Sequence, residues 1–139
     1  DVCNFYMGTF VVAIDQETNM GGQYNDIVIP RDTKLPCSIS KTYTVMADGQ
    51  KVIDCQVTQS EGEEKDVEFV NVLSNEPLEL SKNAKAGDPI EVTYSYDTSG
   101  KMHCIFLDKK NKKKHEINLK PVGSKDFKEL KENLDFDIE

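Results

Sequence analysis

The sequence contains no tryptophan, only two histidines, and no apolar run approaching the ~20 residues that cross a bilayer as a helix. It is also short of positive charge, because 17 lysines and arginines face 25 aspartates and glutamates, for a net charge of −8. Phosphate binding requires clustered cations, so this balance argues against nucleic acid as a partner. We therefore expect neither a nucleic-acid nor a membrane partner.

One basic run, Lys109–His115, departs from this acidic character. It could form a patch for anionic ligands. A solvated loop between two strands is the interpretation we favour, because short charge runs flanked by strand patterns usually lie in water.

Catalytic motifs are also missing. The sequence has no G-x-S-x-G, no H-E-x-x-H and no glycine-rich phosphate loop that opens a helix. His103 alternates with apolar neighbours and is expected to face solvent from a strand, while His115 belongs to the lysine-rich run. We therefore predict no catalytic residue, no metal and no cofactor for this chain, and a binding function in place of an enzymatic one.

The four cysteines, Cys3, Cys37, Cys55 and Cys104, form no C-x-x-C pair. His103 is adjacent to Cys104, but neighbouring strand residues face opposite ways and cannot share a metal. Two of the cysteines lie in apolar strand patterns, where a free thiol behaves as a small hydrophobe. We expect all four to be reduced, and the chain to be cytoplasmic.

The remaining pattern has a period of two, which is typical of strands. The clearest case is Ile90–Asp97, where Ile90, Val92, Tyr94 and Tyr96 are expected to point inward. Strands are predicted at Phe5–Ile14, Asp26–Ile29, Ser40–Met46, Val52–Thr58, Val67–Leu73, Ile90–Asp97, Met102–Asp108 and His115–Leu119. Short strands joined by turns predict a mainly β chain, folded as an antiparallel sandwich or barrel.

Two connections have particular sequence signals. The Asp48–Gly49 step between Ser40–Met46 and Val52–Thr58 predicts a tight turn, so these two strands are expected to pair as a hairpin. Residues 75–88, with prolines near both borders, are expected to form an irregular connection.

The pattern changes after Ser124, where Phe127, Leu130 and Leu134 follow at helical spacing. Ser124 is a suitable N-cap for a short helix. We therefore divide the chain into a β domain at residues 1–120 and a helical segment at residues 121–139.

Three blocks of the sequence resemble the β-sandwich peptide-binding domain of the DnaK-type (seventy-kilodalton heat-shock) chaperones. Ile29–Pro36 is similar to "I-P-R-N-T-x-I-P", and Tyr43–Gln50 with Val57–Glu61 is similar to "F-S-T-A-x-D-N-Q" and "V-x-Q-G-E". Pro89–Met102 is similar to "P-x-I-x-V-x-F-x-I-D-x-N-G-I-L". The blocks occur in the family's order over roughly two thirds of the chain.

The chain also departs from that family. Thr9–Asn19 is longer than the family's first strand and loop, Tyr43 replaces a common phenylalanine, and Cys55 replaces an aliphatic residue. Asp1–Val2 resembles the end of the linker that follows the family's ATPase domain, so the chain looks like an excised piece of a longer protein. The segment after Ser124 would be the start of the family's helical lid.

The resemblance implies a binding site for extended apolar peptides. Its pocket would be formed by Tyr43, Ile53, Cys55 and Ile90. An arch over the peptide would be formed by Met46 and Met20, and Thr44 would offer backbone hydrogen bonds at the edge of the channel. By alternation alone, Ile53, Cys55 and Ile90 read as ordinary core residues.

The implied function is that of a chaperone's substrate-binding domain, which holds extended hydrophobic segments of unfolded proteins. ATP and magnesium would bind a separate ATPase domain of the parent protein, which would also engage a J-domain co-chaperone and a nucleotide-exchange factor. Two alternatives remain: a divergent, chaperone-related interaction or nucleotide-exchange module without peptide binding, and a fragment of an enzyme whose active site lies elsewhere.

Overall fold

The computed structural model describes residues 1–14 and 16–121. Within them the chain forms eight strands and one short 3-10 helix. Their bounds are β1 Tyr6–Ile14, β2 Gly21–Ile29, β3 Cys37–Thr44, β4 Val52–Ser60, η1 Val67–Phe69, β5 Asn71–Glu79, β6 Pro89–Tyr96, β7 Met102–Asp108 and β8 Lys113–Leu119. The helix expected from Ser124 lies outside the described residues.

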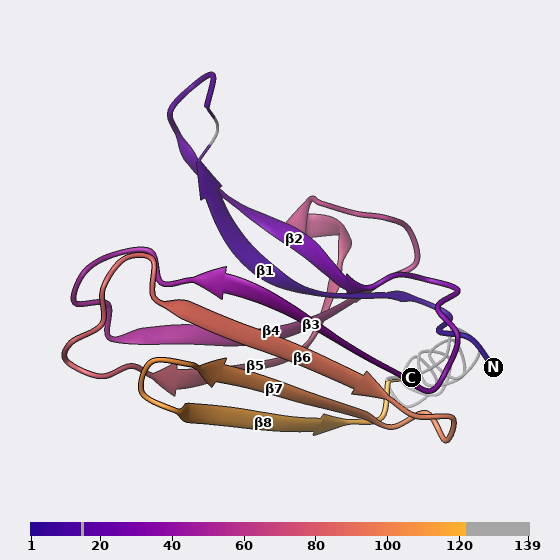
Figure 1. The fold of residues 1–139 in the computed structure, drawn as a ribbon. Coiled ribbons are helices and arrows are strands. Elements are labelled where there is room, and N and C mark those ends of the chain that lie inside the picture. Colours follow the sequence, from indigo (N-terminus) through magenta and orange to yellow (C-terminus); the bar gives the residue numbers. More distant parts are fainter. Residues whose placement is uncertain (15, 122–139) are drawn as a thin grey trace, which may run out of the picture.

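The strands form two four-stranded antiparallel sheets, with the orders β2-β1-β4-β5 and β3-β6-β7-β8 (Figure 1). This arrangement confirms the mainly β, antiparallel class. Alternation along β6 is also confirmed, since Ile90, Val92 and Tyr94 are all buried. No helix among the described residues is long and apolar enough to cross a membrane.

The core is shared between the sheets. Met7 and Val57 contribute to it from the first sheet, and Tyr94 and Phe106 from the second. The two aromatic rings meet edge to face, with centroids 6.3 Å apart. The Tyr94 hydroxyl donates hydrogen bonds across the core, to the carbonyl oxygens of Gly8 (2.6 Å) and Gln56 (3.2 Å), and so joins the sheets through a polar contact as well as apolar packing.

The hairpin predicted around Asp48–Gly49 is wrong. β3 pairs with β6, and β4 pairs with β1 and β5, so the two strands belong to different sheets. Gly49 does adopt a positive φ of 74°, as the turn signal required. However, its N–H donates to the carbonyl of Ala84 (2.7 Å), outside the expected hairpin. The local signal fixed the turn, while distant packing chose the strand partners.

Several strand boundaries differ from the predictions. β3 begins at Cys37 and not at Ser40, and Val67–Phe69, expected as the start of a strand, forms the 3-10 helix, so β5 begins at Asn71. β2 begins at Gly21 because, after a register shift between Met7 and Gly8, the β1–β2 ribbon pairs residue by residue to its end, from Gly8↔Ile27 to Ile14↔Gly21. β5 continues to Glu79, although an irregular connection was expected from residue 75. It tolerates Pro77 because it is the edge strand of its sheet. β8 begins at Lys113, so only part of the basic run forms a turn.

The outer strands of the two sheets are joined by a hydrogen bond between side chains. His115 on β8 and Glu76 on β5 approach to 2.8 Å, and Ser74 also donates to the Glu76 carboxylate at 3.0 Å. The His115 hydrogen bond, followed by that of Ser74, lowers the pKa of Glu76 from its ordinary value of 4.5. This pair links the sheets along the edge where β5 and β8 meet.

The lowered pKa predicts a pH dependence of stability. Because the folded-state pKa is the lower one, the contribution of Glu76 is complete above its unfolded pKa and is lost as pH falls through the folded value. Glu76→Gln should therefore flatten the acid fall of the thermal unfolding midpoint below about pH 4.5. Glu79→Gln on the same strand is the control. An unchanged acid slope in Glu76→Gln would contradict the assignment.

Candidate functional site: a cleft between diverging strands

The site lies where two strands of one sheet separate. β1 pairs with β4 only from Tyr6 to Gly8, opposite Thr58–Ser60. Beyond Gly8, β1 continues in pairing with β2 alone, and β4 continues in pairing with β5 alone. The two facing strand edges therefore diverge, and a cleft of about 450 Å³ opens between them and β3.

The lining of the cleft combines apolar side chains with neutral polar groups. It is formed by Thr9–Val12, Gln23, Thr42–Thr44, Met46, Gln50, Val52–Asp54, Gln56, Ile90, Val92 and Phe106. Among these described residues, Asp54 is the single charged side chain. Among these lining residues there is no thiol and no imidazole.

Tyr43 presents its ring to the cleft while its hydroxyl is bound elsewhere. The hydroxyl donates to the Asp26 carboxylate on β2 at 2.5 Å, and Lys41 forms an ion pair with the same carboxylate at 3.1 Å. Burial, together with this hydrogen bond, raises the pKa of the Tyr43 phenol far above its usual range. The tyrosine is therefore neutral, and its hydroxyl is already satisfied by Asp26.

The loop between β3 and β4 is held in place at one side of the cleft. Gln50 accepts a hydrogen bond from the Met46 N–H and donates to the Val52 carbonyl, both at 3.0 Å. Asp48 accepts from the N–H of Ala86 at 2.9 Å. The Met46 side chain is nevertheless 55% exposed. An exposed methionine on a fixed loop can adapt to different apolar partners.

A small second core lies beneath this loop. Val45, Leu80, Ala84 and Ile90 are buried together, and half-buried Ile53 packs against them as well as against the main core. Ile53 and Ile90 are therefore anchored by the fold and also contribute to the wall of the cleft. Because these side chains are already fixed by packing, a ligand that contacts them would lose little free energy to the ordering of side chains.

The structure brings five of the seven predicted site residues to the cleft: Tyr43, Thr44, Met46, Ile53 and Ile90. Cys55 is fully buried in the main core, where burial raises its pKa to about 12. Met20 lies in the connection between β1 and β2 with 68% of its surface exposed. Neither of these two lines the cleft.

Sequence reasoning missed the contribution of β1. Phe10, Val11 and Val12 line the cleft, although their apolar run read simply as part of a strand. The sequence did not show that β1 pairs with β2 alone beyond Gly8. At such an open edge, side chains from both faces of the strand can border a cleft. The unusual length of Thr9–Asn19 was the one available signal.

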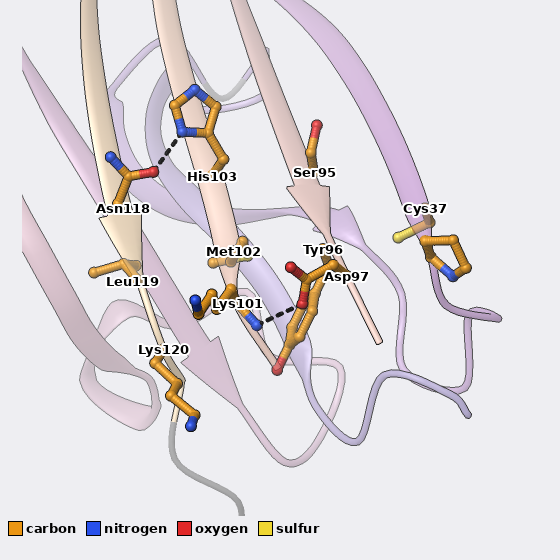
Figure 2. Close-up of a pocket in the computed structure, with 11 residues that line it drawn as sticks. Cys37, Ser95, Tyr96, Asp97, Lys101, Met102, His103, Asn118, Leu119 and Lys120 are labelled. Carbon is orange, nitrogen blue, oxygen red and sulfur yellow. Dashed lines mark hydrogen bonds between the residues drawn. The ribbon is translucent and has the colours of Figure 1, made fainter. Parts of the chain in front are cut away.

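A second and larger hollow, about 730 Å³, lies at the opposite end of β3 and β6 (Figure 2). Figure 2 shows His103 and Asn118 facing each other from β7 and β8. Their side chains are 2.6 Å apart, and the Asp97 carboxylate accepts from the Lys101 N–H at 2.9 Å. The hollow contains none of the predicted site residues, and these polar groups already engage one another. We therefore take the cleft as the candidate site.

Comparison with known proteins places this chain in a family. The sequence model described as "Hsp70 protein" matches residues 11–135. The chain is 33% identical over 102 residues to the "Chaperone protein DnaK" of Ureaplasma urealyticum, which covers 73% of this chain and 16% of that protein. It is 34% identical to the chloroplastic stromal 70 kDa heat shock-related protein of Pisum sativum, over 66% of this chain and 13% of that protein. It is also 34% identical to the corresponding protein of Spinacia oleracea, over 78% of this chain and 18% of that protein. The chain thus spans less than a fifth of the length of these relatives, and it belongs to the Hsp70 family.

Proposed function

We propose that this chain is the substrate-binding part of an Hsp70-type chaperone and that the cleft holds extended apolar segments of unfolded proteins. The observation that carries the proposal is the cleft itself. It lies between two open strand edges, and about half of its lining side chains are apolar. Open edges can form backbone hydrogen bonds with any extended sequence, and apolar pockets select the side chains.

The composition of the lining supports this proposal. Ile53, Ile90 and the ring of Tyr43 would surround one apolar side chain, Met46 would cover it, and Thr44 would offer backbone hydrogen bonds. Burying a leucine or isoleucine side chain is worth ~1.5–3 kcal/mol, which favours apolar segments without holding them permanently. This strength suits a chaperone, which must release what it binds.

The negative charge of the chain should also affect which apolar segments bind. The chain carries a net charge of −8, and Asp54 lies in the cleft wall. Substrates with lysine or arginine beside the apolar core should therefore associate faster than acidic ones, and salt should weaken this preference.

Peptide titration tests the proposal. A labelled heptapeptide with a central leucine and flanking arginines should bind saturably by fluorescence anisotropy. Met46→Asp should weaken binding about tenfold, equivalent to ~1.4 kcal/mol, by placing a charge where the peptide excludes water. Because Met46 is exposed, this variant should fold normally. Ile53→Asp should abolish binding if it folds.

Tyr43→Phe is the matched control for the wall of the cleft. It removes only the hydroxyl that Asp26 already engages, so affinity should stay within about twofold, whereas Tyr43→Ala should lose most of it. The proposal fails if the unmodified chain shows no saturable binding, or if Met46→Asp and Tyr43→Ala both bind like the unmodified chain. The chain would then fit the alternative of an interaction module with a closed channel.

The activities of the parent protein extend this proposal. By analogy with its relatives, an ATPase domain with ATP and magnesium would control the affinity of the cleft, and a J-domain co-chaperone and nucleotide-exchange factor would act through that domain. Testing a longer gene product for peptide release on ATP addition would check this part separately.

A further inference from the structure

The β3–β4, β5–β6 and β7–β8 connections gather at one end of the sandwich, at the left in Figure 1. Two of them are rich in lysine. The β5–β6 connection carries Lys82 and Lys85, and the basic run around the β7–β8 turn carries five more lysines between residues 109 and 114. Seven of the 17 basic residues of this acidic chain therefore lie in two short segments at the same end of the fold.

Hydrogen bonds fix these two segments against each other. Buried Asp108 folds the β7–β8 turn by accepting from the Lys110 N–H at 3.1 Å and from the Asn111 side chain at 3.0 Å. The Lys110 ammonium then donates to the Asn83 carbonyl of the β5–β6 connection at 3.0 Å. The Asn111 side chain also donates to the Ser81 hydroxyl at 2.9 Å. The two connections are therefore held together as one surface.

Four of the seven lysines have no carboxylate partner on this surface. Three are already engaged, in the ion pairs Lys109–Glu91, Lys110–Asp88 and Lys114–Glu116. The others are all exposed and form no ion pair within the part of the chain that the structure describes. We call these four the lysine patch: Lys82, Lys85, Lys112 and Lys113.

A solvated loop accounts for the lysine patch only in part. Lysines that simply keep a turn in water need no fixed relation to a second loop. Here, buried Asp108 and the side chains of Lys110 and Asn111 hold two lysine-bearing segments side by side, although like charges repel one another. The chain has an excess of carboxylates, yet the described residues place none within ion-pair distance of these four ammonium groups. The surface is therefore prepared for negative charge from outside.

We propose that the lysine patch binds a short acidic segment of a partner protein, about four to six residues long with roughly one carboxylate for each lysine. Lysine ammonium groups are flexible point charges, so they accept carboxylates without demanding one geometry. The overall charge of −8 favours a short segment over a long polyanion. Interactions reach about 8 Å at physiological salt, so a short segment meets only the patch, whereas RNA or an anionic membrane would also meet the acidic remainder.

The lysine patch is separate from the cleft, although the two are connected through the fold. None of the four lysines lines the cleft. The β5–β6 connection also holds the β3–β4 loop, because the Ala86 N–H donates to the Asp48 carboxylate at 2.9 Å. Met46 of that loop lines the cleft. A partner at the patch would therefore bind beside a substrate in the cleft without displacing it.

An anisotropy titration of the full chain with a labelled hexaglutamate peptide tests the proposal. The peptide should bind saturably, and raising the salt from about 50 to about 500 mM should weaken binding by roughly tenfold or more. Lys82→Glu combined with Lys112→Glu should weaken binding about tenfold at low salt, because two attractive contacts become repulsive. Both lysines are exposed, so the double variant should fold. The absence of saturable hexaglutamate binding would overturn the proposal.

Lys101→Glu combined with Lys120→Glu is the matched control. These exposed lysines lie beside the hollow of Figure 2, at the other end of the sandwich, and the change adds the same negative charge. The affinity for hexaglutamate should stay within about twofold. Equal losses in the two double variants would overturn the patch, because the peptide would then respond to net charge alone.

Competition distinguishes the lysine patch from the cleft and from other occupants. Saturating leucine-centred heptapeptide should not displace hexaglutamate, and displacement would overturn a separate patch. Failure of the heptapeptide alone to bind would overturn only the proposed function. Tighter binding of oligouridine or phosphatidylglycerol vesicles than of hexaglutamate would overturn the choice of an acidic polypeptide. Carbodiimide cross-links from the patch to carboxylates of residues 122–139, formed without peptide, would replace the partner with the chain itself.

Discussion

Gly8→Ala should lower the free energy of unfolding by about 3 kcal/mol, because a β-carbon at this position has no space. It would overlap the carbonyl oxygen of Asp26 and lie 2.9 Å from Asn25 Oδ1 and 3.0 Å from Thr58 Oγ1. Two of the three obstacles belong to a buried hydrogen bond, since the Thr58 hydroxyl donates to Asn25 Oδ1 at 2.5 Å. Relief of the overlap would disturb that bond and the β1–β2 pairing together. Urea unfolding measures the loss.

Gly21→Ala is the control for this substitution. Gly21 is also a strand residue of the β1–β2 hairpin, but a β-carbon there meets nothing within 4 Å. It should change stability by less than about 0.5 kcal/mol. Similar stabilities of Gly8→Ala and Gly21→Ala would show that the strands do not approach one another at Gly8 as described.

Tyr94→Ala should be the most destabilising change in the core, at about 3–5 kcal/mol. The Tyr94 side chain is fully buried, packs against Phe106, and spans from the second sheet to backbone carbonyls on β1 and β4. Its removal leaves a cavity between the sheets and deprives the carbonyl of Gly8 of its 2.6 Å donor. Thermal or urea unfolding again gives the measurement.

Tyr94→Phe separates the hydroxyl from the ring. It keeps the packing and removes only the donor, so it should cost about 1–3 kcal/mol. Because the Gly8 and Gln56 carbonyls flank the point where β1 and β4 diverge, this variant should also increase amide exchange beside the cleft. A cost for Tyr94→Phe equal to that for Tyr94→Ala would contradict the division between packing and hydrogen bonding.

The elements of this fold were largely predictable because alternation is a local property. Ile90, Val92 and Tyr94 read directly as an inward face. Strand pairing was not predictable in the same way. Asp48–Gly49 has the chemistry of a hairpin turn, yet it connects two sheets, since pairing depends on which distant strand buries each face. The loop's bonds to Ala84 and Ala86 have no signature in the sequence.

The candidate site was likewise only partly predictable from the sequence. The resemblance pointed to Tyr43, Ile53 and Ile90, and the fold brings them to one cleft. Alternation read Cys55 correctly as a core residue, but it could not distinguish it from Ile53 on the same face, which also lines the cleft. Nor could it show that Phe10–Val12 border the cleft, because an open strand edge is a property of the whole sheet.

The most direct test of the proposed function is a methyl NMR titration of the chain with the leucine-centred heptapeptide. Ile53 and Ile90 lie in the cleft, whereas Leu119 lies in the hollow at the other end of the molecule. We predict saturable shifts of the Ile53 and Ile90 methyl signals with one common Kd, and no shift of Leu119. Shifts centred on Leu119, or no saturable change at the two isoleucines, would contradict the assignment of the cleft as the peptide-binding site.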